Sequence, residues 1–462
     1  MSEPASKSAR AVAAEVLHRF DAGGVHAGPL LDRLLPQTDQ KQRATDLVFG
    51  TIRNLLAIDR VIEQFSGRPV RRIDESLRAI IRVGVYELAY SPDTPVYSIV
   101  DEAVKIAGHA GGRRQMGFVN AVLRGIVRHI AARQTPVREA SAARMLVQSP
   151  QAGCEFDTDF LPDATSYPAA YLSECFSIPR WLVEGWITEF GPQGARAICL
   201  GSNRRPSVYV RVNTLKTRPG HLVEHFREVG IDAEVVAAAN GSSQADMVRL
   251  LGPQAISRLP GYAEGWFTVQ DPAAARAVCL LNPQPGWAIL DLCAAPGTKT
   301  TQLAEWTRDD ARIVATDADA ERLKNVTENV ARLGCNSVTV VPCTPAEWGR
   351  HGPFDAILLD VPCSNTGVLA RRIEVRHRVR PASVAQLAGR QLALLAQAAA
   401  LLKEHGRICY STCSIESAED GDLVRRFLAA DSRFTLVHEE LALPSAAPFD
   451  HDGAYVAILQ RL

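Results

Sequence analysis

From about residue 266 to the C-terminal end, short apolar segments of strand length alternate with stretches of helical periodicity. Unbroken apolar strands that alternate with helices are typical of a parallel sheet covered on both faces. The sequence therefore predicts an α/β domain at 266–462 with a doubly wound, mostly parallel sheet. The expected strands are 288–292, 312–316, 337–341, 355–359 and 407–410, and the expected helices are 300–307, 320–333 and 383–402. Segments 434–437 and 454–459 have no helix between them, so we expect them to pair antiparallel at one edge.

The preceding residues follow other patterns. Residues 1–133 carry apolar stripes at helical spacing, separated by short Gly and Pro clusters, which predicts an all-helical bundle. Residues 134–170 lose this periodicity and are expected to form a linker. Residues 171–265 combine an alternating segment at 207–213 with a helical one at 221–229, which indicates a small α+β subdomain.

Charge and cysteine usage exclude several classes of protein. Lys plus Arg and Asp plus Glu are both 51, so the chain is not a uniformly basic polyanion binder, although residues 1–133 hold 19 basic against 14 acidic side chains. No apolar run approaches the roughly 20 residues that cross a bilayer, and the start lacks the apolar core of a signal peptide. The ten cysteines form no CxxC pair. They are expected to be thiols in a reducing cytoplasm, with no metal and no membrane partner.

The first motif that carries chemistry follows the strand at 288–292. A tight turn of small residues opens a helix there, so that free backbone N–H groups can meet an anion such as the carboxylate of a methionine moiety. Asp317 ends the next strand, where an acid suits the diol of a ribose. The turn lacks the spacing of a phosphate-binding P-loop. We therefore predict an adenosine-type cofactor site at Asp317 and at the turn residues Cys293, Ala294, Ala295, Pro296, Gly297, Thr298 and Lys299.

Two further motifs lie at the ends of later strands. The segment 358–364 carries Asp360 and Cys363, and the segment 408–414 carries Cys413. Ligands of such sheets bind beyond the carboxyl ends of the strands, so two thiols and one carboxylate are expected to converge beside the cofactor turn. Seven other cysteines are expected to be structural: Cys154, Cys175, Cys199, Cys279, Cys335, Cys343 and Cys409.

This set of groups suits methylation of a pyrimidine at carbon 5. Carbon 5 is a weak nucleophile until a thiolate adds to carbon 6 and makes the ring enamine-like. A carboxylic acid near nitrogen 3 stabilises the charge that develops, and loss of the carbon 5 proton then frees the thiolate. The arginine-rich segment 366–380, which includes Arg371 and Arg372, lies between the two thiols and suits a phosphate backbone.

The three motifs resemble those of the RNA cytosine-carbon-5 methyltransferase family, which includes the bacterial Sun (RsmB-type) and human NOL/NSUN-type proteins. They stand here at 291–297, 360–364 and 412–414. The resemblance implies that S-adenosyl-L-methionine is the cofactor, that Cys413 is the nucleophile, that Cys363 assists release of the methylated base, and that Asp360 lies near both cofactor and cytosine.

The resemblance extends over most of the chain. Segments 48–53 and 117–124 are similar to the NusB-type RNA-binding fold, and 211–216 and 269–271 resemble segments that precede the catalytic domain in this family. A fused NusB-like domain is the arrangement of family members that modify small-subunit (16S) ribosomal RNA. The expected partner is therefore ribosomal RNA, bound in part through Arg211 and Asn213, and a monomer is expected.

The sequence departs from the family pattern at three places. Thr298 stands where Gly is usual, and the segment 341–345 lacks the usual adenine-side Asp, which leaves Cys343 or Thr344 near the base. The usual Pro-Asp and Trp after the paired arginines are absent. Two alternatives stay open at this stage: the same chemistry on transfer RNA, or a non-catalytic RNA-binding or ribosome-assembly factor with a methyltransferase-like fold.

Overall fold

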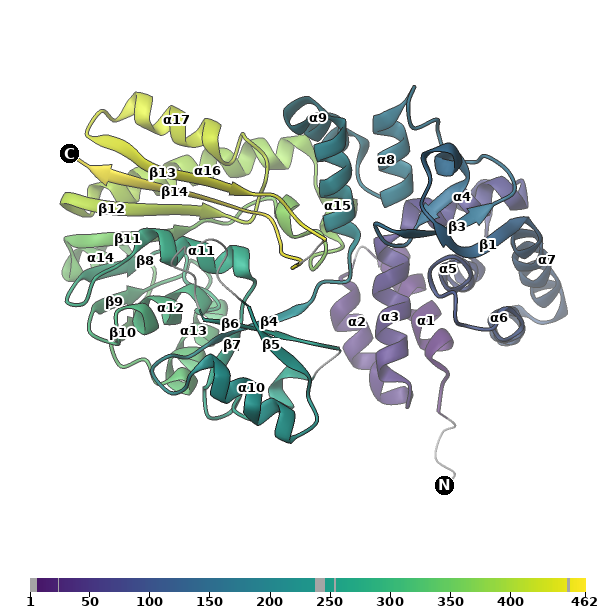
Figure 1. The fold of residues 1–462 in the computed structure, drawn as a ribbon, viewed down its shortest axis with the longest axis horizontal. Coiled ribbons are helices and arrows are strands. Elements are labelled where there is room, and N and C mark those ends of the chain that lie inside the picture. The colour runs from purple at the N-terminus through teal and green to yellow at the C-terminus, as the bar shows by residue number, and fades with distance from the viewer. Residues whose placement is uncertain (1–5, 24, 237–245, 253–254, 447–448) are drawn as a thin grey trace. The chain divides into compact units, whose positions relative to one another are not determined.

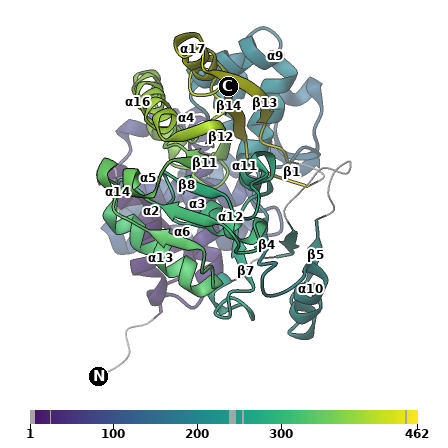
Figure 2. The ribbon, with the colours of Figure 1, turned by 90° about the vertical axis from the view of Figure 1, so that its left-hand side faces the viewer.

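The structure is a computed structural model that describes residues 6–23, 25–236, 246–252, 255–446 and 449–462 (Figures 1 and 2). The chain divides into two compact units. The first comprises Met1–Arg204 and Arg372–Arg378, and the second comprises Arg205–Arg371 and Val379–Leu462. Neither boundary falls at residue 266, and the short segment Arg372–Arg378 belongs to the first unit although it lies between the two thiol motifs.

The first unit begins with the expected helical bundle. Its helices are α1 (Ala9–Gly23), α2 (Ala27–Leu34), α3 (Lys41–Arg53), α4 (Leu55–Ser66), α5 (Glu75–Tyr90), α6 (Val96–Gly111) and α7 (Arg113–His129), with 3₁₀ turns η1 (Leu35–Gln37) and η2 (Val70–Arg72). Asp74 starts α5 because its carboxylate accepts from the backbone N–H of Ser76 and Leu77. The apolar stripe of α5, from Leu77 to Leu88, is buried against its neighbours, which confirms the predicted helical domain.

The segment 134–170 differs from the linker that its lack of periodicity predicts. It contains the end of β1 (Ile130–Pro136), all of β2 (Met145–Val147) and β3 (Ala152–Phe156), and the 3₁₀ helix η3 (Glu139–Arg144). The strands form an antiparallel sheet in the order β1-β3-β2. Helices α8 (Pro168–Phe176) and α9 (Arg180–Asn203) follow, and α9 breaks at Gly191 and Pro192. Burial of Leu146, Cys154 and Phe156 explains why this segment is ordered.

The second unit begins with the small α+β subdomain. Its antiparallel sheet has the order β5-β6-β4-β7, and α10 packs on one face. The elements are β4 (Val208–Val212), α10 (Pro219–Glu228), β5 (Ala233–Val235), β6 (Met247–Leu250), η5 (Ile256–Arg258) and β7 (Phe267–Val269). The strand predicted at 207–213 and the helix predicted at 221–229 are therefore present.

The large sheet confirms the predicted doubly wound topology. Its order is β10-β9-β8-β11-β12-β14-β13, with parallel pairing from β10 to β12 and antiparallel pairing of β14 and β13 at the edge. The strands are β8 (Ala288–Asp291), β9 (Arg312–Ala315), β10 (Val338–Val340), β11 (Phe354–Asp360), β12 (Leu402–Thr412), β13 (Phe434–Ala442) and β14 (Ala454–Arg461). The helices are α11 (Pro272–Leu281), α12 (Thr298–Trp306), α13 (Ala320–Leu333), α14 (Pro345–His351), α15 (Val375–Arg378), α16 (Pro381–Ala400) and α17 (Gly421–Ala430), with η6 (Thr366–Val368).

Helices cover both faces of this sheet. One core joins α14, α16 and α17 to strand residues such as Ile357 and Tyr410, and the other joins α11, α12 and α13 to strand residues such as Leu358 and Cys409. Alternate strand residues thus enter opposite cores, which is why the strands are apolar throughout. In the part of the chain that the structure describes, no helix is long and apolar enough to cross a membrane.

Candidate active site

A tight turn joins β8 to α12 and forms one wall of a cavity. Gly297 has φ +98°, and a Cβ there would lie 3.2 Å from the Val326 backbone, so the close approach of α13 favours glycine. The cavity has a volume of about 220 Å³, and its lining includes Gln270, Asp291, Lys299 and Asp360 together with Cys293, Ala294, Ala295, Pro296 and Thr298. The structure therefore places most of the predicted cofactor residues around one cavity.

Asp291 has a buried carboxyl oxygen that faces no protein donor. Its Oδ2 accepts a hydrogen bond of 2.6 Å from Thr300 Oγ1, but Oδ1 is buried without a hydrogen-bond partner among the described residues. Burial raises the pKa of Asp291 to about 7. A buried, unpaired acceptor that lines a cavity is an expected feature of a ligand site, because leaving it unpaired is costly.

Asp317 is a neighbour of the turn rather than of the cavity. Its Oδ2 accepts from the Ala295 backbone N–H at 3.1 Å and its Oδ1 from that of Asp319 at 3.0 Å. The carboxylate therefore fixes the shape of the turn. After the next strand, β10, Thr344 caps α14 by accepting from the backbone N–H of Glu347, and Cys343 packs against the core.

Adjacent strands bring the other predicted groups together. Asp360, at the end of β11, pairs in register with Ser411 of β12, whose hydroxyl donates to Asp360 Oδ1 at 2.8 Å. Lys299 Nζ lies 2.6 Å from Asp360 Oδ2. Burial alone lowers the pKa of Lys299, but Asp360 and the nearby Cys413 raise it by more, so Lys299 stays cationic. A buried ammonium beside a thiol stabilises the thiolate form.

The two thiols predicted to converge lie in contact. Cys363 Sγ and Cys413 Sγ are 3.0 Å apart. Cys363 is buried and Cys413 is partly exposed. The hydrogen bond to Cys413, followed by burial, raises the pKa of Cys363 well above its usual value, so Cys363 keeps its proton. Cys413 is therefore the more accessible thiol and the one beside a cation.

Asn365 is a contact of Cys413 that the sequence did not predict. Its Oδ1 accepts from Cys413 Sγ at 3.2 Å while its Nδ2 donates to the Cys363 carbonyl at 2.8 Å. The residue adopts a left-handed conformation, with φ +61°, which Asn tolerates better than most residues. Its place two residues after Cys363 was the available signal, but an Asn in a turn is more often structural.

The predicted RNA contacts of Arg211 and Asn213 do not fit their placement. Arg211 is fully buried and bonds both carboxylate oxygens of Glu305 at 2.7 and 2.8 Å. Asn213 is also fully buried and donates to the carbonyls of Gly265 and Leu333. Both side chains join the small subdomain to α12 and α13, because a buried charge or amide needs protein partners.

Arginine side chains of the segment 366–380 also have partners within the protein. Arg371 pairs with Asp271 and Asp452 at 2.9 and 2.6 Å, whereas Arg372 is exposed. Within the first unit, Arg376 is buried and donates to the carbonyls of Arg53, Phe176 and Ser202, and burial lowers its pKa to about 9. Both predicted phosphate contacts are exposed, but Arg371 is held in ion pairs within the protein.

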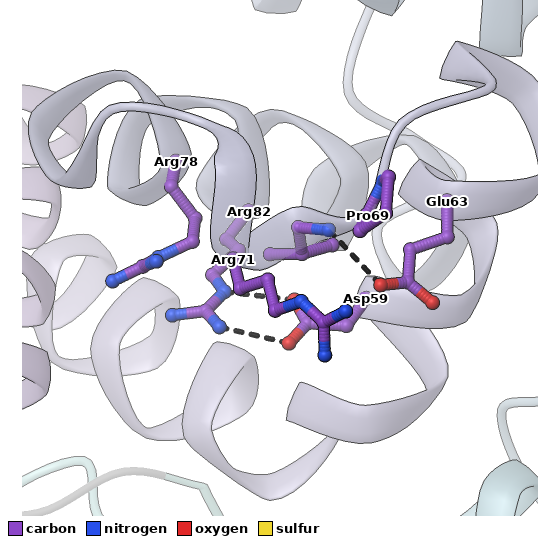
Figure 3. A pocket seen from close by; sticks show the side chains of 7 residues that line it. Asp59, Glu63, Pro69, Arg71, Arg78 and Arg82 are labelled. Atoms are coloured by element: carbon purple, nitrogen blue, oxygen red, sulfur yellow. Dashed lines mark hydrogen bonds and ion pairs between the residues drawn. The ribbon is translucent and has the colours of Figure 1, made fainter.

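A second cavity lies in the first unit, between α4, η2 and α5 (Figure 3). Its volume is about 600 Å³, and it is lined by Asp59, Glu63, Pro69, Val70, Arg71, Arg78 and Arg82. Arg82 holds the Asp59 carboxylate through two bonds of 2.8 Å, and Glu63 accepts from the Val70 backbone. Both carboxylates therefore already have partners within the protein, and the three arginines make the lining of this cavity net basic.

No group of three or more His, Cys, Asp or Glu in the described chain is placed to hold a metal ion.

Comparison with known proteins agrees with this architecture. A family model described as 16S rRNA methyltransferase RsmB/F matches residues 278–456, a NusB family model matches 7–128, and a ferredoxin-like domain of RsmF/B-like methyltransferases matches 178–255.

The chain resembles three solved structures in fold. PH0851 has a TM-score of 0.71 at 23% identity and covers 99% of this chain and 100% of its own. NSun6 from Pyrococcus horikoshii with SFG has a TM-score of 0.53 at 20% identity, covering 61% and 98%. A methyltransferase homolog from the same organism has a TM-score of 0.54 at 24% identity, covering 64% and 99%.

Curated relatives match over almost the whole chain. The ribosomal RNA small subunit methyltransferase B of Serratia proteamaculans is 32% identical, with 98% of each chain covered. The protein of that name from Vibrio cholerae is 31% identical, with 98% of this chain and 97% of its own covered. The three motifs at 291–297, 360–364 and 412–414 all lie inside the matched methyltransferase domain. The chain therefore belongs to the ribosomal RNA small subunit methyltransferase B family, within the RsmB/F group of methyltransferases.

Proposed function

We propose that this chain transfers a methyl group from S-adenosyl-L-methionine to carbon 5 of a cytosine in small-subunit (16S) ribosomal RNA. The observation that carries the proposal is the thiol pair Cys363 and Cys413, 3.0 Å apart beside the Lys299–Asp360 ion pair. A protein that only bound RNA would need neither thiol. The names of the curated relatives support the substrate class.

The cavity beside β8 suits the methyl donor. The donor supplies an electrophilic methyl group, and its methionine moiety carries an ammonium and a carboxylate. The unpaired Asp291 Oδ1 is a fitting acceptor for the ammonium, and the first backbone N–H groups of α12 suit the carboxylate. Residues Ala294–Pro296 supply small, apolar contacts at the same wall.

Asp291 makes donor binding dependent on pH. Its pKa of about 7 means that the carboxyl is protonated below that pH and then carries no charge for the ammonium. We expect the affinity for S-adenosyl-L-methionine to be constant above pH 8 and to fall by up to about tenfold per unit below pH 7. Calorimetric titrations between pH 5.5 and 8.5 measure this dependence.

A matched pair of variants distinguishes the effect of the Asp291 carboxyl on donor affinity from that of another nearby carboxylate. Asp291→Asn should bind weakly at every pH, whereas Asp319→Asn, which alters a carboxylate that caps α13, should keep the wild-type profile. An affinity that stays constant from pH 8.5 to pH 5.5 in the wild-type protein would show that Asp291 does not meet the ammonium.

Cys413 is proposed to supply the covalent step. Its sulfur, as a thiolate beside the Lys299 ammonium, adds to carbon 6 of the cytosine, and carbon 5 becomes nucleophilic. We propose that the Asp360 carboxyl, at the end of the neighbouring strand, lies next to nitrogen 3 of the cytosine and stabilises the charge that develops on the ring. After methylation, a water molecule acting as base takes the carbon 5 proton. The electron pair of that C–H bond re-forms the double bond between carbons 5 and 6, and the sulfur of Cys413 leaves carbon 6 as a thiolate. Cys363 is placed to donate its hydrogen bond to the departing sulfur.

The first unit is proposed to bind the RNA backbone through the basic surface around η2. Arg71 lines the second cavity and Arg72 follows it, and both side chains are exposed. Neither guanidinium has a hydrogen bond or ion pair with the described residues. Such side chains are available to phosphates at little desolvation cost.

Removing both charges should weaken RNA binding without affecting the chemistry. We expect Arg71→Ala with Arg72→Ala to reduce the slope of log affinity against log salt by about two. Filter binding with 16S ribosomal RNA at several salt concentrations measures the slope. The control is Arg19→Ala with Lys105→Ala, which removes two basic side chains from surface ion pairs of the same unit. Equal slopes for the two double variants would exclude this surface as an RNA-binding site.

The direct test of the proposed function is methyl transfer to defined RNA. The full chain is incubated with donor labelled in the methyl group and with one of three substrates: naked 16S ribosomal RNA, small ribosomal subunits or transfer RNA. The RNA is then digested to nucleosides. Label in 5-methylcytidine is the expected result. Label in transfer RNA alone would change the target, and RNA binding without any label would favour an assembly factor.

A further inference from the structure

A single buried carboxylate, Glu419, contacts the residues that follow both thiols. Its side chain is fully buried. Oε1 accepts from the backbone N–H of Ser364 at 2.9 Å, and Oε2 accepts from the hydroxyl of Ser414 at 2.7 Å. The Ser364 hydroxyl also donates to Oε2. Ser364 directly follows Cys363 and Ser414 directly follows Cys413, so one carboxylate links the two thiol-bearing loops.

A helix and a strand fix the position of this carboxylate. Gln391 of α16 donates from Nε2 to Glu419 Oε1 at 2.9 Å and also to the Pro362 carbonyl at 3.0 Å. Tyr410 of β12 donates from its hydroxyl to the Glu419 carbonyl at 2.6 Å. The loop of Cys363 is therefore held on both sides of the thiol, at Pro362 and at Ser364, by groups that belong to the rigid part of the domain.

We infer that Glu419 is a positioning residue that sets the separation of the two thiols. The expected effect of Glu419 on catalysis rests on the proposed function. Glu419 would act on the reaction only through the thiols, because it has no contact with either sulfur. A hydrogen bond between thiols weakens steeply with distance, and a misplacement of about 1 Å at a reacting centre can cost about 100-fold in rate. Four hydrogen bonds to one buried acceptor hold the loops more closely than backbone contacts alone.

The thiol separation can be measured without any methylation assay. Diamide oxidises two neighbouring thiols to a disulfide and is itself reduced to the hydrazine, so the rate of Cys363–Cys413 disulfide formation reports how closely the sulfurs approach. We expect Glu419→Ala to slow this reaction at least about tenfold. In the same protein the kcat for methyl transfer should fall about 100-fold, with the KM for RNA and the affinity for the donor unchanged.

Conservative variants keep the test valid if Glu419→Ala does not fold. Glu419→Gln retains the shape and the Oε1 acceptor, and the serine hydroxyls can rotate to accept from its amide, so disulfide formation and kcat should recover most of the wild-type rate. Ser414→Ala removes one of the bonds to Oε2 and should give a partial loss. The control is Glu305→Gln, which weakens another buried carboxylate of the same unit, the partner of Arg211.

The outcomes separate positioning from stability. If Glu305→Gln lowers the thermal midpoint as much as Glu419→Ala but oxidises its thiols at the wild-type rate, Glu419 positions the thiols. Wild-type oxidation rates in Glu419→Ala and Ser414→Ala would overturn the inference. Slower oxidation in the Glu419 variant, together with a wild-type protein that methylates no RNA, would reject the proposed function and leave the positioning role intact.

Discussion

Alanine in place of Cys413 is expected to reduce methyl transfer by at least about 10⁴-fold, because no other group can make carbon 5 nucleophilic. The thiol is partly exposed, whereas its neighbour Cys363 is buried and keeps its proton. The substitution removes one sulfur that does not line the cavity beside β8, so donor and RNA affinities should remain within about twofold. Label transfer under single-turnover conditions measures the chemical step, and calorimetry measures donor binding.

The matched control for this substitution is Cys409→Ala. Cys409 lies on β12, the strand that Cys413 directly follows, but it is fully buried in the core and donates to the Ala277 carbonyl. Its loss should lower stability by about 1 kcal/mol and leave methyl transfer within a few-fold of wild type. An active Cys413→Ala protein would remove the nucleophile from the proposal, and an inactive Cys363→Ala protein beside it would exchange the roles of the two thiols.

The sequence predicted the large sheet well because its strands are buried on both faces. The expected strand at 355–359 lies inside β11 (Phe354–Asp360), and that at 337–341 contains β10 (Val338–Val340). Such strands are unbroken apolar runs, which a single sequence displays directly. The convergence of Asp360, Cys363 and Cys413 followed from topology, since parallel neighbouring strands end at one edge of the sheet.

The sequence failed where long-range pairing decides the structure. The strands β1 to β3 are short and their apolar residues follow no regular spacing, so their order depends on partners elsewhere in the first unit. Arg211 has the local pattern of a surface charge, yet Glu305, 94 residues later, keeps it buried. The role of Glu419 is hidden for the same reason, because its partner Ser364 lies 55 residues away.

Alanine in place of Cys363 is expected to trap the covalent protein–RNA adduct. Addition of Cys413 and methylation do not require Cys363, but release loses the thiol that lies 3.0 Å from the departing sulfur. Loss of one proton-donating group typically slows a step about 10² to 10⁴-fold. The methylated RNA should therefore accumulate as a species that resists denaturation, and a denaturing gel of protein incubated with donor and 16S ribosomal RNA detects it.

The adduct should depend on both partners of the thiol pair. Cys363→Ala combined with Cys413→Ala should give no adduct, because the sulfur that bonds to carbon 6 is absent, and omission of the donor should reduce the amount, because release is slow only after methylation. Asn365→Ala tests the contact between Asn365 and Cys413 and should leave adduct formation in place, since Asn365 accepts from the thiol and is not needed by the thiolate.

An adduct that persists in the double variant would place the bond on another residue. A Cys363→Ala protein that turns over at the wild-type rate would mean that release uses a different donor, and the 3.0 Å contact would then serve only to hold Cys413 in place.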